Sequence, residues 1–377
     1  MDFLFTDEQN LLRDSVKKFV EKDYAFETRR ALLKSELGFS KDTWRSFAEL
    51  GWTALPFSEA DGGLGGKAVD TMIVLEEFGK GLVLEPYLPS IVFAGGLLRR
   101  AGDAVRQRYL PGLIGGETIG AVAYAEPESR FDLAQVATSA KRDGDGFVLN
   151  GKKLAVLAGD SADLLLVSAR TAGAKGDRSG ITIFAVDAKA KGVARVNYPT
   201  VDGLRAANLA LEGVKVGKDQ VVGEVDQGLP LLSAVSDEVI VALSAEATGI
   251  MEVLYKSTVA YTKERKQFGV PIAAFQVLQH RMVDMFMEYE QFKSLMYWAT
   301  MCQDAQRDVA RAASSLKIML SRSGKIVGQS AIQNHGGMGM TEELAVSHYF
   351  KRLTMIDLLL GNGDYHLDRY RELPAAG

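Results

Sequence analysis

The sequence is poor in the residues that build disulfide frameworks and metal sites. Its 377 residues include one cysteine, Cys302, and four histidines. A single cysteine excludes an intrachain disulfide and any zinc cluster built on several cysteines. The histidines stand at positions 280, 335, 348 and 366, without the H-E-x-x-H spacing of a zinc site, so we expect no bound metal.

The chain also lacks a strong charge of either sign and a long apolar run. Its 44 lysine and arginine residues face 48 acidic ones, which predicts no nucleic-acid or membrane partner. The longest apolar stretch, 87–98, is interrupted by Pro89 and is too short to span a bilayer. The acidic start does not look like a secretory signal, and we therefore expect a cytoplasmic protein.

What the sequence does contain is a globular composition whose pattern changes twice along the chain. Over 6–115 apolar residues recur at helical spacing, beginning with a capping box of Thr6 and Gln9. Over 118–223 the period is two, and turn residues separate strand-like runs. Four long helical segments follow, at 229–265, 274–302, 304–335 and 341–360.

These patterns predict an α+β multidomain chain with three domains. Residues 1–117 are expected to form an all-α N-terminal domain. Residues 118–224 read as a middle antiparallel β-barrel or sandwich, and residues 225–377 as a C-terminal four-helix bundle.

Two turns of the predicted bundle carry residues suited to a nucleotide. In RKQFGVPI, at 265–272, Arg265 can clamp a pyrophosphate and Phe268 can stack on a base, although a plain interhelical loop is the alternative. In QNHGGMGM, at 333–340, glycines let backbone N–H groups approach a phosphate. This second turn is neither a P-loop nor a Rossmann fingerprint, and alone it is equally compatible with a simple connection.

The remaining candidates are isolated ionisable residues. Asp237 and Glu238 lie on an apolar helix, either at the rim of the core or as a base in a hydrophobic pocket with a raised pKa. We expect His366 at the surface and Cys302 as a small packing residue.

Taken together, the motifs resemble the acyl-CoA dehydrogenase family along nearly the whole chain. The segments that carry the resemblance are AEPESRFD (125–132), NGKK (150–153), ERKQFGVPIAAFQVLQH (264–280), QNHGGMGMTEE (333–343) and KRLTMIDLLLGNGDYHLDR (351–369). The sequence is most similar to the small-subunit type of pimeloyl-CoA dehydrogenase and to subunits of heteromeric steroid side-chain acyl-CoA dehydrogenases.

The resemblance implies α,β-dehydrogenation of an acyl-CoA thioester, in which a carboxylate removes the α-proton and FAD accepts the β-hydride. In this family each FAD spans two subunits, and an electron-transferring flavoprotein is the implied electron acceptor. The contacts to the adenine and pyrophosphate of the neighbour's FAD match Arg265, Gln267, Phe268, Gln276, Gln333, Gly336 and Gly337.

The chain departs from the family where the flavin ring and the base are expected. Leu360 aligns with the usual catalytic Glu, and leucine cannot accept a proton. Asp237 aligns with the base that some members carry on the first bundle helix, and Glu238 replaces a common arginine. The family's Trp-x-Thr and Gly-Ser-Asp, which contact the flavin ring and the CoA phosphate region, align with Ala155-Val156-Leu157 and Arg130-Phe131-Asp132.

We therefore expect a subunit of an α2β2 heteromer, in which this chain completes the FAD site of a paralogous partner and lacks the usual base. The alternatives are a self-sufficient homo-oligomer that uses Asp237 as base, or a non-catalytic binding paralogue. The substrate is expected to be a dicarboxylic acyl-CoA such as pimeloyl-CoA, or a steroid side-chain acyl-CoA.

Overall fold

A computed structural model of the chain describes residues 4–374. By backbone contact the chain divides into two compact units, each made of segments that are distant in sequence. Residues 1–31, 68–83 and 240–377 form the first, here called the bundle unit. Residues 32–67 and 84–239 form the second, here called the sheet unit.

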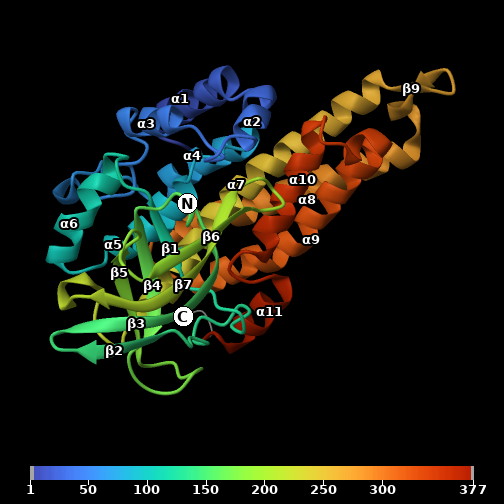
Figure 1. Cartoon of the computed structure of the whole chain (residues 1–377). Helices are drawn as coiled ribbons and strands as arrows, with labels where there is room; N and C mark the ends of the chain where they lie inside the picture. The colour runs from blue at the N-terminus through green and yellow to red at the C-terminus, as the bar shows by residue number, and fades with distance from the viewer. Residues whose placement is uncertain (1–3, 375–377) are drawn as a thin grey trace. The chain divides into compact units, whose positions relative to one another are not determined.

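Long helices make up the bundle unit. Helices α8 (Gln276–Asp304), α9 (Val309–His335) and α10 (Ala345–Leu358) lie side by side with the C-terminal part of α7 (Gly228–Glu264) (Figure 1). These are the four predicted bundle helices, and their observed ends differ from the expected ones by a few residues. The other helices of the unit are α1 (Asp7–Asp23), α4 (Ala68–Gly81), α11 (Gly363–Glu372) and most of α2 (Phe26–Leu33), whose last two residues are assigned to the sheet unit. The capping box of Thr6 and Gln9 at the start of α1 is confirmed.

Short elements join the long helices at their ends. The hairpin of β9 (Lys266–Gln267) and β10 (Val270–Pro271), followed by the 3₁₀ turn η4 (Ile272–Ala274), connects α7 to α8 (Figure 1). A second 3₁₀ turn, η5 (Gly336–Met340), follows α9.

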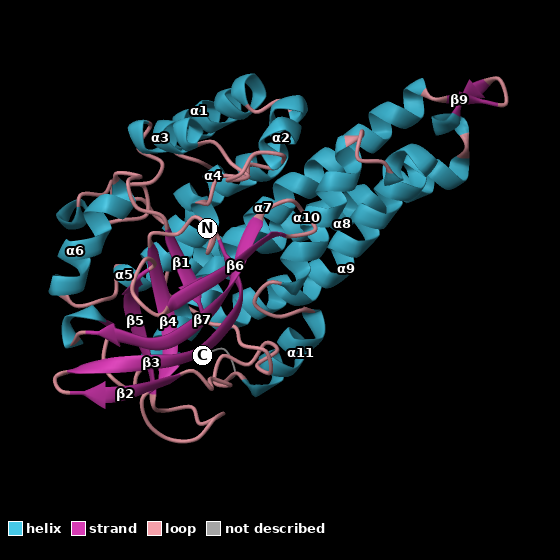
Figure 2. Cartoon of the chain, in the orientation of Figure 1, coloured by secondary structure: helices cyan, strands magenta, loops and turns pink. Residues whose placement is uncertain are grey.

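The sheet unit is built around one eight-stranded sheet, shown in magenta in Figure 2. Its strands run in the order β6-β7-β3-β2-β4-β5-β8, with β1 paired to β4. Most pairs are antiparallel, as predicted, but β4 pairs in parallel with both β1 and β2. The strands are β1 (Gly120–Ala123), β2 (Ser139–Asp143), β3 (Gly146–Leu157), β4 (Leu164–Arg170), β5 (Ile181–Asp187), β6 (Val193–Pro199), β7 (Arg205–Val216) and β8 (Val221–Val222).

Side chains from both central and flanking strands fill the core of the sheet unit. Phe147 and Phe184 pack against each other with ring centroids 5.1 Å apart, among buried leucines and valines such as Leu149, Val167 and Leu209. The helical elements of this unit are α3 (Lys41–Glu49), η1 (Glu59–Asp61), the π-helical η2 (Tyr87–Ala94), α5 (Gly95–Leu98), α6 (Asp103–Ile114) and η3 (Lys218–Gln220).

Helix α7 has the length and composition of a membrane-spanning helix, but its apolar window is mostly covered. The window has a mean hydropathy of 1.5, and 78% of it is buried inside the structure. That burial is the behaviour of a core helix whose apolar side chains contact other protein elements on all sides.

Within the bundle unit, α4 and α7 cross so closely that their backbones touch. A Cβ atom on Gly79 would lie 2.1 Å from the carbonyl oxygen of Glu246, and one on Gly249 would lie 2.0 Å from that of Glu76. Glycine inside a helix costs about 1 kcal/mol relative to alanine. Only glycine fits at these two positions, because the backbone of each helix occupies the space that a side chain on the other would need.

We predict that Gly249→Ala lowers the free energy of unfolding by about 1–3 kcal/mol, the usual cost of overpacking a core, although alanine favours the helix. Denaturant titration followed by far-UV circular dichroism measures this change. Gly337→Ala is the control, because a Cβ there meets nothing within 4 Å. Equal stability of Gly249→Ala and the native chain would show that the two helices separate easily.

Candidate functional site

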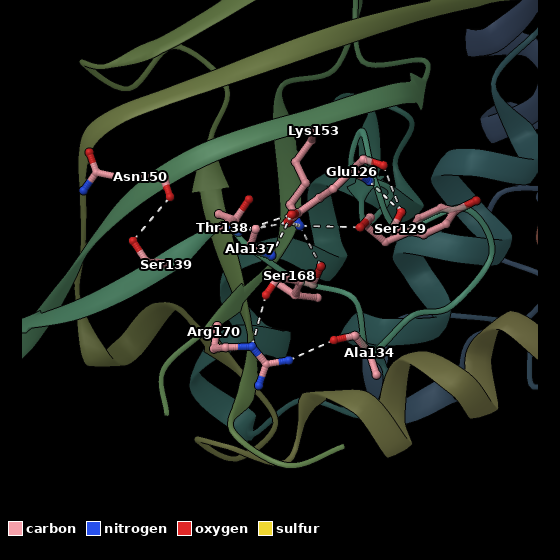
Figure 3. Close-up of polar contacts among 12 residues, drawn as sticks. Glu126, Ser129, Ala134, Ala137, Thr138, Ser139, Asn150, Lys153, Ser168 and Arg170 are labelled. Atoms are coloured by element: carbon pink, nitrogen blue, oxygen red, sulfur yellow. Dashed lines mark hydrogen bonds and ion pairs between the residues drawn. The ribbon is translucent and has the colours of Figure 1, made fainter. Parts of the chain in front are cut away.

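A buried ion pair anchors the segment of the sheet unit that contains AEPESRFD. Lys153 lies on β3 with none of its side chain exposed. Its Nζ donates to Oε1 of Glu126 at 2.7 Å and to Oγ of Ser168 at 3.0 Å (Figure 3). Burial lowers the pKa of Lys153 to about 8, against the opposing effect of the Glu126 carboxylate. The ammonium therefore depends on Glu126 to stay charged in this interior.

The Glu126 carboxylate also closes the loop that begins at its own position. Its oxygens accept the backbone N–H of Ala137 at 2.7 Å and that of Thr138 at 3.1 Å (Figure 3). Burial acts to raise the pKa of Glu126, but Lys153 and these hydrogen bonds outweigh it and hold that pKa below its ordinary value. One carboxylate thus joins both ends of the 126–138 loop to strand β3.

The rest of this loop is held by Asp132 within it and by Arg170 from the neighbouring strand β4. Asp132 accepts the backbone N–H of Ala134 at 3.0 Å and is 3.3 Å from Nε2 of Gln135. Arg170, on β4, donates to the carbonyl oxygens of Val136 and Ala134 at 3.0 and 2.8 Å (Figure 3). The Asp132 carboxylate is consequently used inside the loop, where it supports the turn.

The positions aligned with the family's Trp-x-Thr lie at the end of β3, next to Lys153. Ala155 is exposed with a φ of +50°, at an irregularity in the pairing of β3 with β7, and Leu157 is half-buried. Neither side chain has a hydrogen-bond donor. The side chains here therefore do not fit the polar edge of a flavin ring, and only backbone groups remain for that role.

On α7, the structure gives Glu238 partners that the sequence analysis missed. Its carboxylate, 5% exposed, accepts Nη2 of Arg99 at 2.6 Å and Nη2 of Arg100 at 2.5 Å. These arginines follow α5, and their pairing with position 238 is visible only in the folded sheet unit. Asp237, which precedes Glu238 in the sequence, is also buried, with 4% of its surface exposed. The negative charge of Glu238 is thus neutralised by two guanidinium groups.

The residues expected to contact the adenine end of FAD gather at one end of the bundle unit. Helices α7 and α9 both end there, and Tyr261 near the end of α7 stacks on His335 at the end of α9, with ring centroids 4.4 Å apart. All seven expected residues are exposed: Arg265, Gln267, Phe268, Gln276, Gln333, Gly336 and Gly337.

This end of the bundle unit fits a nucleotide in its donors and its free space. A Cβ atom on Gly336 or Gly337 would meet nothing within 4 Å, so a ligand can approach the backbone closely there. The N–H of Gly336 itself donates to carbonyl oxygens of Ile332 and Gln333 at the end of α9. Phe268 has 91% of its surface exposed, which leaves a ring face for stacking. The guanidinium of Arg265 and the amides of Gln267, Gln276 and Gln333 supply the hydrogen bonds that a pyrophosphate and a base require.

Leu360, at the expected position of the usual base, lies in a turn between α10 and α11. It is half-buried and has a φ of +59°, a left-handed conformation that leucine rarely adopts. His366 contacts this turn, with Nε2 2.9 Å from the carbonyl oxygen of Leu360. The expectation that His366 lies at the surface is wrong, because only 1% of it is exposed. Its hydrogen bond to the turn lets the imidazole be buried.

We predict that Lys153→Met lowers the free energy of unfolding by about 3–5 kcal/mol, since it leaves the buried Glu126 carboxylate without its cation. Adding Glu126→Gln should recover part of this loss by removing the charge. Thermal and denaturant unfolding measure both effects. Lys152→Met is the control, because Lys152 is exposed on the same strand. A loss no larger than that of the control would contradict the role given to the ion pair.

A pH-dependent loss of stability should come from His366. Burial lowers the pKa of His366 to about 4, although the hydrogen bond to Leu360 opposes this shift. Below pH 6.5 the unfolded chain gains a proton that the folded chain does not take until pH 4, so the free energy of unfolding falls across this window, by up to about 3 kcal/mol.

His366→Gln keeps an N–H donor for Leu360 and removes the titration, and its stability should vary less between pH 6.5 and 4. His335 and His348, whose pKa values are also lowered by burial, remain in both proteins, so the difference isolates His366. Denaturant titrations at several pH values measure it. Parallel pH curves for the two proteins would show that folding does not lower the pKa of His366.

Comparison with known proteins places the whole chain in one family. Three family descriptions match it in order: the N-terminal domain of acyl-CoA dehydrogenase at residues 6–117, the middle domain at 121–214 and the C-terminal domain at 227–372. The probable acyl-CoA dehydrogenase YngJ of Bacillus subtilis is 28% identical over 375 residues, which cover 98% of each chain.

Solved structures agree with this assignment. The ChsE4-ChsE5 complex from Mycobacterium tuberculosis contains a chain that is 26% identical, with a TM-score of 0.90 and 100% of both chains covered. A variant of the Tcur3481-Tcur3483 steroid ACAD is 28% identical, with a TM-score of 0.87 and 97% of both chains covered. The chain therefore belongs to the acyl-CoA dehydrogenase family, whose members are FAD-dependent oxidoreductases.

Proposed function

We propose that this chain is one subunit of a heteromeric FAD-dependent acyl-CoA dehydrogenase and that it completes the FAD site of a paralogous partner. The exposed end of the bundle unit would contact the adenine and pyrophosphate of the partner's FAD. The partner would supply the catalytic Glu and the side-chain contacts to the flavin ring. FAD, once bound, provides the hydride acceptor of the reaction, and this chain contributes binding and orientation.

The observation that carries the proposal is the contrast between the two ends of the expected FAD site. Every adenine-side residue is present and exposed, and there is free space beside the backbone of Gly336 and Gly337. At the ring side, Ala155 and Leu157 offer no side-chain donor, and Leu360 offers no base. A chain that kept only the contacts to a neighbour's cofactor is expected when two different subunits share the work.

The similar structures support the same proposal. One of them is a complex of two different proteins, ChsE4 and ChsE5, and another is the steroid ACAD Tcur3481-Tcur3483. By analogy, we propose that the substrate is the CoA thioester of the side chain of a steroid, in preference to a dicarboxylic acyl-CoA. An electron-transferring flavoprotein is proposed as the electron acceptor.

A self-sufficient enzyme that uses Asp237 as its base is the second candidate. Asp237 is buried, as a base acting on a weakly acidic carbon should be. The neighbouring Glu238 is neutralised by Arg99 and Arg100, so it adds no uncompensated negative charge beside Asp237. Asp is one methylene shorter than Glu, and an error of ~1 Å in reach can lower the rate ~100-fold.

Co-expression with a paralogous chain that carries the catalytic Glu tests the proposal. We predict that this chain alone is colourless and inactive, whereas the complex binds about one FAD for every two chains and oxidises acyl-CoA. Arg265→Ala should lower the FAD content of the complex at least severalfold, because it removes a charge-assisted contact to the pyrophosphate. Visible absorbance and protein mass in solution measure FAD content and assembly.

Two variants separate the candidates. Lys266→Ala is the control for Arg265→Ala, because Lys266 is exposed on the same hairpin and is not among the expected contacts. Asp237→Asn should leave the turnover of the complex unchanged. A yellow, active chain in the absence of any partner, inactivated by Asp237→Asn, would overturn the proposal in favour of the second candidate.

A further inference from the structure

A buried ammonium group holds the turn that contains Leu360. Lys317 lies on α9 with no exposed surface. Its Nζ donates to three backbone carbonyl oxygens, those of Ile356 and Asp357 at 2.7 Å each and that of Leu359 at 2.8 Å. An ammonium has three N–H donors, and this geometry uses all of them on one short stretch of backbone.

The three carbonyl groups need a partner because they lie where α10 ends. The last four carbonyl groups of a helix receive no N–H donor from within that helix, and burying them unpaired is costly. A cation at this place is also favoured by the helix dipole. Lys317 therefore caps α10 from the neighbouring helix, although an amine of this kind is rarely found fully buried.

Two further side chains hold the same turn from other directions. The Ser321 hydroxyl donates to the Asp357 carboxylate and accepts the backbone N–H of Gly363 at 2.8 Å. Since a carbonyl oxygen only accepts, the 2.9 Å contact between His366 and Leu360 requires the proton on Nε2 of the imidazole. The Ser314 hydroxyl, 3.2 Å from Nδ1, is then the donor to that nitrogen.

Close packing leaves the turn little freedom. A Cβ atom on Gly361 would lie 2.4 Å from the Tyr365 ring, and one on Gly363 would lie 2.5 Å from the Ser321 hydroxyl. Leu360 stands directly before Gly361 and has a left-handed φ of +59°. A strained backbone of this kind, which costs about 1–3 kcal/mol, persists only where its surroundings over-determine it.

We propose that Lys317 is a positioning residue which, together with His366, fixes the backbone of residues 359–363 and presents the side chain at position 360 in one orientation. The turn keeps the rigid frame that a catalytic side chain requires, while its own side chain is leucine. The identification of position 360 as a lost base position rests on the proposed function. The role of Lys317 in fixing the turn does not.

A spin label at position 360 tests this directly, and it needs neither FAD nor substrate. The chain has one cysteine, so Cys302→Ser with Leu360→Cys gives a single attachment site. Lys317→Met is then added, because methionine fills a similar volume without a donor. Lys325→Met is the matched control, since Lys325 lies on the same helix and is exposed.

The expected result is a severalfold rise in the mobile fraction of the label in Lys317→Met, and no rise in Lys325→Met, while circular dichroism shows a folded chain in both. If Lys317→Met does not fold, His366→Phe and His366→Gln decide the question. Phenylalanine removes the donor to Leu360 and should mobilise the label, whereas glutamine keeps a donor and should not.

An equally immobile label in every folded variant would overturn the proposal, since Lys317 would then cap α10 without controlling position 360. This outcome is distinguishable from failure of the proposed function. The label reports on the turn in this chain alone, whereas the proposed function is decided by FAD content and turnover with the partner.

Discussion

The contact between the backbones of α4 and α7 is the constraint on which the bundle unit depends. Gly79 and Gly249 let the two helices meet with no side chain between them. This closeness brings other buried pairs within reach, among them Glu246 on α7, whose carboxylate accepts Nε of Arg352 at 2.5 Å and Nη2 at 2.8 Å. Tyr349 on α10 donates its hydroxyl to the carbonyl oxygen of Lys80, at the end of α4. Within the bundle unit, the close approach of α4 and α7 thus depends on two positions without side chains.

In each unit, a buried lysine fixes a segment of irregular backbone near the expected site. Lys153 holds the 126–138 loop through Glu126, and Lys317 holds the 359–363 turn through three carbonyl groups. In a water-poor interior such bonds are strong, and an unpaired partner is costly. Loops that lack regular hydrogen bonding are thereby given a defined shape. In the proposed function, these supported segments are the ones whose own side chains do not offer the family's usual chemistry.

The two ends of the FAD site that we propose differ in the side chains they offer. The adenine side keeps charged and amide side chains on an exposed end of the bundle unit, where a ligand attached to another chain can reach them. At the proposed ring side, backbone support is present and side-chain donors are absent. Replacing a support residue would unpair buried groups and destabilise the fold, whereas Leu360, Ala155 and Leu157 pair with no buried charge.

The sequence by itself determined the order of helical, β and helical regions, because periods of 3.6 and 2 follow directly from helix and strand geometry. It also determined the family, and it named the residues that now lie together at one end of the bundle unit. Only the tertiary structure decided the partners of buried charges. Arg99 and Arg100 are 138 or more residues from Glu238, and Lys317 is about 40 residues from the carbonyl groups it binds. Such pairings depend on which side chains the fold brings together, and a local pattern of residues does not contain that information.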